Sequence, residues 1–125
     1  MRVGFYGGEP LLQIGLIKRC VEYIESRVNG HTIQFNMTTN GTLLTDDVVD
    51  FLVAHHFRIS ISLDGPREDH NINRKFRSGE GSFDKIMENV QRLKERYPEA
   101  AKDVTFMTVI NPRAELTHVM EYFDT

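Results

Sequence analysis

The chain has very little cysteine: one residue, Cys20, among 125, and it has no tryptophan at all. A disulfide framework needs paired cysteines, and a cysteine metal site needs several thiolates at close spacing. This chain alone therefore supplies neither, and no metal ligands are expected within it. Because Cys20 falls inside a helical pattern, we expect it to be a small buried hydrophobe.

The chain also lacks an excess of either charge and any long apolar run. Its net charge is −3 at pH 7 and its pI is about 5.9, which gives no general attraction to nucleic acid or to an anionic membrane. No segment approaches the roughly 20 apolar residues of a membrane span, and no basic segment precedes an apolar stretch at the N-terminus. We therefore expect a cytoplasmic protein that binds neither nucleic acid nor membrane.

Strand and helix patterns alternate along the chain. Strands are predicted at residues 2–6, 32–38, 58–63 and 104–110, and helices at about 11–28, 46–55, 83–97 and 115–123. Asn29-Gly30 is expected to end the first helix, while Thr45 and Ser82 are expected to cap the second and third. Four successive βα units predict a parallel α/β sheet, either a segment of a barrel or an open doubly wound sheet.

Distinctive residues follow each of the first three strands: Gly7-Gly8-Glu9-Pro10, Thr39-Asn40-Gly41 and Ser62-Leu63-Asp64-Gly65. Ligands of parallel α/β folds bind at the carboxyl ends of the strands, so the three loops predict one shared site. The paired glycines leave the backbone open to a ligand, and the carboxylate that follows them suits an ammonium group. Each loop taken singly is also typical of an ordinary turn, and that alternative stays open on physical grounds alone.

The polar stretch at residues 67–81 is unusually long. A βα connection commonly has about 2 to 6 residues, so a charged segment of this length is expected to be functional or mobile.

These motifs, followed by His70, Arg74 and Gly79-Glu80-Gly81-Ser82-Phe83, closely resemble radical S-adenosylmethionine (SAM) enzymes. The most similar branch comprises anaerobic sulfatase-maturating and peptide-modifying enzymes that usually carry a C-terminal SPASM domain. The resemblance covers residues 1–125 and implies about four parallel βα units of a partial (βα)6 TIM barrel. It further implies an enzyme that cleaves SAM to a 5′-deoxyadenosyl radical, which abstracts hydrogen from a protein or peptide side chain.

The resemblance assigns the first loop to the amino group of the cofactor. In the family, the Gly-Gly-Glu motif holds the amino group of the methionine moiety. Carried over, Gly7 and Gly8 offer backbone contacts and Glu9 an ionic hydrogen bond, with Pro10 beginning the helix that follows.

The resemblance assigns the third loop to a carboxylate. The family uses the serine of an S-x-D-G motif, and an arginine about a dozen positions later, to hold the substrate carboxylate. Ser62 and Arg74 match these positions and are expected in the cofactor site, because a planar guanidinium can donate two parallel hydrogen bonds to a carboxylate. Asn40 is expected either to bond to cofactor or substrate or to hold its own turn.

Asp64 matches a family aspartate close to the reacting substrate, where it is a candidate proton acceptor, so it is the expected catalytic residue. The alternative is that Asp64 accepts backbone N–H bonds and ties the turn at Gly65-Pro66. His70 stands four positions before Arg74, and a structural hydrogen bond that steadies the loop is expected of it rather than catalysis.

The sequence departs from the family in one respect. Radical SAM enzymes hold a [4Fe-4S] cluster with a C-x3-C-x2-C motif upstream of the Gly-Gly-Glu strand, whereas this sequence begins at that strand and has only Cys20. We therefore expect a fragment without the first strand, the cluster loop and the C-terminal part of the enzyme. Alone it should be inactive, should bind SAM weakly and should self-associate through unpaired sheet edges.

A different class of function is also consistent with the sequence: a non-catalytic α/β scaffold that uses these loops to bind a protein partner or a small anion. An ordinary phosphate-binding α/β protein is disfavoured, because the chain has neither G-x-G-x-x-G nor G-K-[ST].

Overall fold

One parallel sheet organises the molecule, which is represented by a computed structural model that describes residues 1–28 and 32–124. The strands are β1 (Arg2–Phe5), β2 (Gln34–Thr39), β3 (Arg58–Ser62) and β4 (Thr105–Met107), and they pair in the order β1-β2-β3-β4. Strands that neighbour one another in chain order form a segment of a barrel, because a doubly wound sheet reverses its order at a switch point. The predicted parallel sheet is confirmed, and of the two predicted arrangements it has that of a barrel segment.

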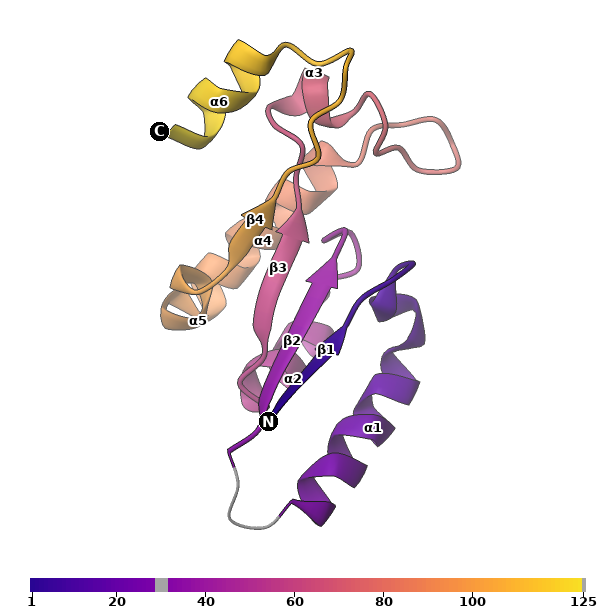
Figure 1. The fold of residues 1–125 in the computed structure, drawn as a ribbon, viewed down its shortest axis with the longest axis vertical. Coiled ribbons are helices and arrows are strands. Elements are labelled where there is room, and N and C mark those ends of the chain that lie inside the picture. The colour runs from indigo at the N-terminus through magenta and orange to yellow at the C-terminus, as the bar shows by residue number, and fades with distance from the viewer. Residues whose placement is uncertain (29–31, 125) are drawn as a thin grey trace.

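A helical segment follows each strand. They are η1 (Pro10–Gln13), α1 (Ile14–Arg27), α2 (Asp46–Ala54), α3 (Arg67–His70), α4 (Phe83–Arg96), α5 (Pro98–Lys102) and α6 (Leu116–Asp124). The expected helix end at Asn29-Gly30 lies outside the described residues. Figure 1 shows α2 and α4 behind the sheet and the strands in front of them.

The two faces of the sheet differ in polarity because side chains alternate along a strand. In β2, Phe35 and Met37 are buried while Asn36 is half-buried, and in β3 the buried Ile61 precedes the half-buried Ser62. The apolar face packs against the helices. The polar face lies on the opposite side of the sheet, with the candidate residue Ser62 at its carboxyl end.

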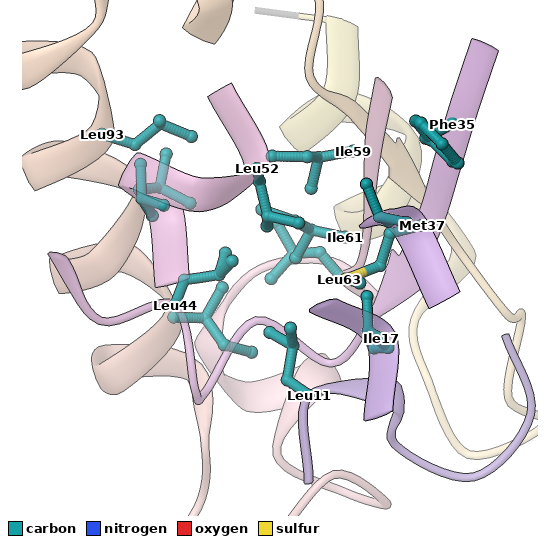
Figure 2. Close-up of a cluster of buried hydrophobic side chains, with 14 of the residues drawn as sticks. Leu11, Ile17, Phe35, Met37, Leu44, Leu52, Ile59, Ile61, Leu63 and Leu93 are labelled. Atoms are coloured by element: carbon teal, nitrogen blue, oxygen red, sulfur yellow. The ribbon is translucent and has the colours of Figure 1, made fainter. Parts of the chain in front are cut away.

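The core fills the space between the apolar face and the helices. Figure 2 shows side chains of β2 and β3 meeting side chains from the helices. The labelled members of the core are Leu11, Ile17, Phe35, Met37, Leu44, Leu52, Ile59, Ile61, Leu63 and Leu93. Burying one such side chain contributes roughly 1.5–3 kcal/mol. In α4, Ile86, Val90 and Leu93 recur at helical spacing, so this helix buries one continuous apolar stripe.

The first helix begins later than predicted. Residues 10–13 form a tighter 3-10 turn, and the α-helix starts at Ile14. Pro10 occupies the first helical position, as predicted, where its missing N–H has no intrahelical partner. The carboxylate of Glu9 caps this turn by accepting the Leu11 N–H at 3.2 Å.

The fourth strand is shorter than the predicted 104–110. β4 ends at Met107, because beyond it the chain bonds to the end of β3 instead of continuing the ladder. The Thr108 hydroxyl donates to the Leu63 carbonyl at 2.8 Å, and the Val109 N–H donates to the Asp64 carboxylate at 3.1 Å. The segment after β4 is thereby fixed to the third candidate loop.

One predicted cap is confirmed and one is wrong. Thr45 caps α2 through its hydroxyl, which accepts the Val48 N–H at 3.5 Å. Ser82 stands before α4 but makes no capping bond. Its hydroxyl lies instead between His70 and Arg74, at 2.9 Å from the imidazole Nε2 of His70 and 2.8 Å from the Arg74 carbonyl oxygen.

The polar stretch at residues 67–81 is held by specific contacts. After α3, Lys75 and Gly81 form an antiparallel bridge, and the Phe76 N–H donates to the Glu80 carbonyl at 2.7 Å. A Cβ on Gly81 would lie only 2.0 Å from the side chain of Asn71, which itself accepts the Phe83 N–H. Glycine at this position lets the hairpin close against α3 and α4.

Two further properties concern the described part of the chain. Within residues 1–28 and 32–124, no helix combines the length and the hydropathy that crossing a membrane requires. Cys20 is half-buried, so the expectation of a buried thiol is met only in part.

Candidate functional site

Glu9 joins the first predicted loop to the second. Its Oε1 accepts the Asn40 N–H at 2.8 Å, and its Oε2 accepts the Thr39 hydroxyl at 2.7 Å as well as the Leu11 N–H. We call Glu9, Leu11, Thr39 and Asn40 the Glu9 cluster. A carboxylate has about four acceptor positions, so three donors leave one position, on Oε1, for a further donor.

The two glycines before Glu9 have backbone conformations that favour glycine. Gly7 has φ +86° and Gly8 has φ +55°, in the left-handed region. A Cβ built on either one would meet no atom within 4 Å among the described residues. The glycines are thus required by the turn itself, and the space beside their backbone is open to a ligand.

Asn40 holds its own turn. Its Oδ1 accepts both the N–H of Thr42, at 2.9 Å, and the Thr42 hydroxyl, at 2.7 Å. From behind, the buried Asn89 of α4 donates to the Gly41 carbonyl at 2.8 Å. The predicted turn role is confirmed for the side-chain oxygen, while a contact between Asn40 and a ligand stays a prediction.

Asp64 pairs with Arg74 at the third loop. Its Oδ2 accepts the Arg74 Nε–H at 2.8 Å, and its Oδ1 accepts the Val109 N–H at 3.1 Å. The residue is only 7% exposed. Asp64 does accept a backbone N–H, as the turn alternative proposes, but the donor comes from the segment after β4 and not from Gly65-Pro66.

His70 is fully buried beside this pair and connects its two backbones. Its Nδ1 faces the Asp64 N–H at 3.1 Å, so Nδ1 must be the unprotonated nitrogen that accepts. Nε2 then carries the proton and donates to the Ser82 hydroxyl at 2.9 Å, which donates in turn to the Arg74 carbonyl at 2.8 Å. We call Asp64, His70, Ser82 and Arg74 the Asp64 ring.

The ring holds His70 in its neutral form. Burial lowers the pKa of His70 to about 4; the charge of Asp64 opposes this shift, and that of Arg74 adds to it. An imidazole with this pKa is neutral at pH 7 and supplies one donor and one acceptor. The prediction that His70 steadies the loop through a structural hydrogen bond is confirmed.

The last two predicted residues keep free donors. The hydroxyl of Ser62 and the Nη groups of Arg74 form no hydrogen bond within residues 1–28 and 32–124. Asn40 and Arg74 line a common cavity of about 170 Å³, together with Thr42, Asn73, Lys75, Phe76 and Ser82. The cavity therefore lies between the Glu9 cluster and the Asp64 ring. No group of three or more metal-ligating side chains occurs in the described part of the chain.

Comparison with known proteins identifies the family. Residues 2–124 match the Radical SAM superfamily. The chain belongs to this superfamily.

Two curated relatives are anaerobic sulfatase-maturating enzymes, by their names. The serine-type anaerobic sulfatase-maturating enzyme of Bacteroides thetaiotaomicron is 36% identical over 91 residues, which are 72% of this chain and 22% of that enzyme. The cysteine-type enzyme of Clostridium perfringens is 30% identical over 124 residues, which are 95% of this chain and 32% of that enzyme. The chain thus spans about a fifth to a third of these relatives.

A solved structure has the same fold. Native anSMEcpe with bound AdoMet and the Kp18Cys peptide superposes with a TM-score of 0.83 at 28% identity, over 98% of this chain and 34% of that chain. The expected partial TIM barrel is confirmed, and the described residues form four of its parallel βα units.

Sequence reasoning missed the role of two residues in this radical SAM fold. The sequence shows Thr39 only as part of a turn motif, yet Thr39 is 2% exposed and its hydroxyl holds Glu9. Its position on the buried face of β2, two residues after Met37, is a signal that could have revealed a buried polar group at the strand end. The sequence predicts a helix cap at Ser82, and no local signal shows that its hydroxyl joins the Asp64 ring.

Proposed function

We propose that the chain is part of a radical SAM enzyme that cleaves SAM to a 5′-deoxyadenosyl radical. The radical abstracts hydrogen from a side chain of a protein or peptide substrate, as in the maturation of sulfatases. The superfamily match, the sulfatase-maturating relatives and the peptide-bound structural neighbour support this proposal. It concerns the whole enzyme, because the chain spans at most a third of the relatives described above.

The observation that carries the proposal is the orientation of the Glu9 carboxylate. Three donors of the Glu9 cluster fix its plane, and one acceptor position on Oε1 remains for an ammonium group. Gly7 and Gly8 leave backbone groups open beside it. This fits the amino group of the methionine moiety of SAM, with Pro10 holding the start of the following helix.

Ser62 and Arg74 are expected in the cofactor site, so we assign to them the carboxylate of the same moiety instead of a substrate carboxylate. Arg74 uses Nε for Asp64, which leaves its Nη donors for a ligand. The Ser62 hydroxyl at the end of β3 adds a neutral donor. The carboxylate that follows β1, and the guanidinium and hydroxyl of the third loop, match in charge the two charged groups of an α-amino acid.

The catalytic role of Asp64 stays a prediction, and its contacts favour a different role. Both carboxylate oxygens already accept hydrogen bonds, from Arg74 and from Val109. A group so engaged is suited to orienting Arg74. Each Asp64 oxygen keeps one further acceptor position, and a substrate proton would have to reach Asp64 at one of these.

The [4Fe-4S] cluster that supplies the electron in radical SAM chemistry does not fit the residues of this chain. Cys20 is its one thiol, and three thiolates are needed. Any cluster must therefore be held by other parts of the enzyme, and the chain alone is proposed to be inactive.

Calorimetric titration with SAM tests the cofactor assignment. The wild-type chain is expected to bind SAM weakly, and Glu9→Gln is expected to weaken binding about tenfold or more, since an ionic hydrogen bond becomes a neutral one. Glu22→Gln on the exposed side of α1 is the matched control and leaves the affinity unchanged. Binding that does not depend on Glu9 would support the competing scaffold function instead.

An enzyme of the relatives' length that contains these residues tests the reaction itself. Loaded anaerobically with its cluster and a reductant, it is expected to form 5′-deoxyadenosine from SAM. Absence of this product in a fully loaded enzyme contradicts the proposed chemistry.

We also propose that the isolated chain self-associates. Among the described strands, β1 and β4 form the two edges of the sheet and neither has a second partner. Large apolar side chains are exposed at the end of β4, in the segment after it and on α6, namely Met107, Val109, Ile110, Leu116 and Met120. Sedimentation velocity is expected to show a species larger than 14.5 kDa, and a stable monomer at high concentration contradicts the proposal.

A further inference from the structure

Four hydrogen bonds of the Asp64 ring run in one direction around a closed circuit. Asp64 N–H donates to His70 Nδ1, His70 Nε2–H to the Ser82 hydroxyl, the Ser82 hydroxyl to the Arg74 carbonyl, and Arg74 Nε–H to Asp64 Oδ2. Each residue donates once and accepts once within the circuit. Only one histidine tautomer is compatible with this order, because the Asp64 N–H cannot accept.

We propose that His70 and Ser82 are positioning residues that hold the Arg74 guanidinium in place for its carboxylate ligand. This rests on the proposed function only in naming that ligand as the carboxylate of SAM. Ser82 also lines the cavity beside Arg74, but within the circuit His70 and Ser82 act through the backbone of Asp64 and of Arg74.

The circuit is buried, so a hydrogen bond that it loses is not replaced by one to water. His70 is fully buried and Ser82 and Asp64 are nearly so, which excludes water as a substitute partner. The Arg74 side chain, in contrast, is 27% exposed, so its outer end reaches toward solvent while Nε is held inside. Bonds arranged head to tail in a low dielectric also strengthen one another.

The sequence spacing explains why the circuit needs this loop. Arg74 lies ten residues after Asp64 and Ser82 lies eight residues after Arg74, and the hairpin formed by residues 75–81 brings Ser82 back to Arg74. The Ser82 N–H also donates to the Arg74 carbonyl at 3.0 Å. Removing the hydroxyl therefore loosens Arg74 without releasing its backbone.

Nuclear magnetic resonance on the full chain tests the inference without any cofactor. In wild type, a long-range ¹H–¹⁵N spectrum is expected to show a protonated Nε2 and an unprotonated Nδ1 for His70. Ser82→Ala is expected to speed solvent exchange of the Arg74 Nε–H roughly fivefold to tenfold, as a buried hydrogen bond is lost. Ser82 makes no capping bond, so alanine there removes no cap from α4.

Ser78→Ala is the matched control in the same hairpin, because Ser78 is exposed and outside the circuit, and it should leave the Arg74 exchange rate unchanged. The inference is overturned by the Nδ1–H tautomer in wild type, or by unchanged Arg74 exchange in Ser82→Ala. The tautomer decides the matter even where Ser82→Ala fails to fold.

Adding SAM at millimolar concentration separates this inference from the proposed function. Arg74 signals that respond in wild type, with about fivefold weaker binding in Ser82→Ala, support both. If wild type does not respond to SAM, the cofactor assignment fails, while the exchange data without SAM still decide the role of His70 and Ser82.

Discussion

The two carboxylates at the carboxyl edge of the sheet are held by different kinds of donor. Glu9 accepts only neutral groups, the N–H of Leu11 and of Asn40 and the hydroxyl of Thr39. Asp64 accepts a guanidinium, and its own N–H reaches a buried histidine. The Glu9 cluster is therefore a fixed acceptor, whereas the geometry of the Asp64 ring depends on a charge pair and on one tautomer.

The two groups also differ in how the chain builds them. The Glu9 cluster needs only the ends of β1 and β2 and the two short turns that follow them. The Asp64 ring needs α3, the hairpin at residues 75–81 and the start of α4, and Val109 reaches it from beyond β4. The first group is set by neighbouring strands, and the second by an inserted loop.

The largest expected difference is the cost of removing each carboxylate. Asp64→Ala is expected to lower the free energy of unfolding by about 3 kcal/mol, because it leaves the Arg74 charge and the Val109 N–H without a buried partner. Glu9→Ala is expected to cost about 2 kcal/mol, since only neutral donors lose their acceptor. Urea denaturation measures both, and Glu22→Ala serves as an exposed control that stays within about 0.5 kcal/mol of wild type. An equal or larger cost for Glu9→Ala contradicts the comparison.

Acid is expected to weaken the Asp64 ring specifically. The folded pKa of His70 is about 4 and its ordinary value is 6.5, so the unfolded chain binds the extra proton first as the pH falls. The contribution of His70 is fully present above pH 6.5 and is lost between pH 6.5 and 4, up to about 3 kcal/mol. The charged groups that act on His70 are Asp64 and Arg74.

Urea denaturation at several pH values measures this loss. His70→Gln cannot take up the proton and is expected to flatten the pH dependence between pH 6.5 and 4 relative to wild type. An identical slope in both proteins would assign the acid sensitivity to other groups.

A substitution at Gly81, in the inserted loop, is expected to disturb the Asp64 ring and leave the Glu9 cluster intact. Gly81→Ala places a Cβ against the Asn71 side chain and is expected to cost about 2 kcal/mol, with shifted signals in the Asp64 ring and unchanged signals in the Glu9 cluster. Gly15→Ala is the control, because its Cβ meets no described atom and alanine favours the helix by up to about 1 kcal/mol. Equal effects of the two substitutions on stability contradict the role of Gly81.

The smallest expected effect concerns the hydroxyl that holds Glu9. Thr39→Val keeps the shape but removes the donor to Glu9, at an expected cost of about 1 kcal/mol. Thr39→Ser keeps the hydroxyl and is expected to retain the Glu9 orientation, seen as an unshifted Asn40 amide signal. A valine variant as stable as wild type, with that signal unshifted, would show that Thr39 does not position Glu9.

The sequence predicted the four βα units and the grouping of their loops because both follow from local periodicity and from the rule that parallel strands end at one edge. The family resemblance indicates Ser62 and Arg74, and the spacing from Arg74 indicates the role of His70. The pairing of Asp64 with Arg74 and with Val109 was not predicted, since it joins residues 10 and 45 positions apart.

The sequence by itself determined the family, the parallel sheet and the residues that line its carboxyl edge. The tertiary structure alone decided what each polar group bonds to. The Ser82 hydroxyl bonds within the Asp64 ring instead of capping α4, and the Thr39 hydroxyl bonds to Glu9. The tertiary structure also ends β4 at Met107, because the next residue bonds to the end of β3. The physical reason is that local patterns fix backbone conformation and burial, whereas a buried polar group takes whichever partner the packing of distant segments brings within reach.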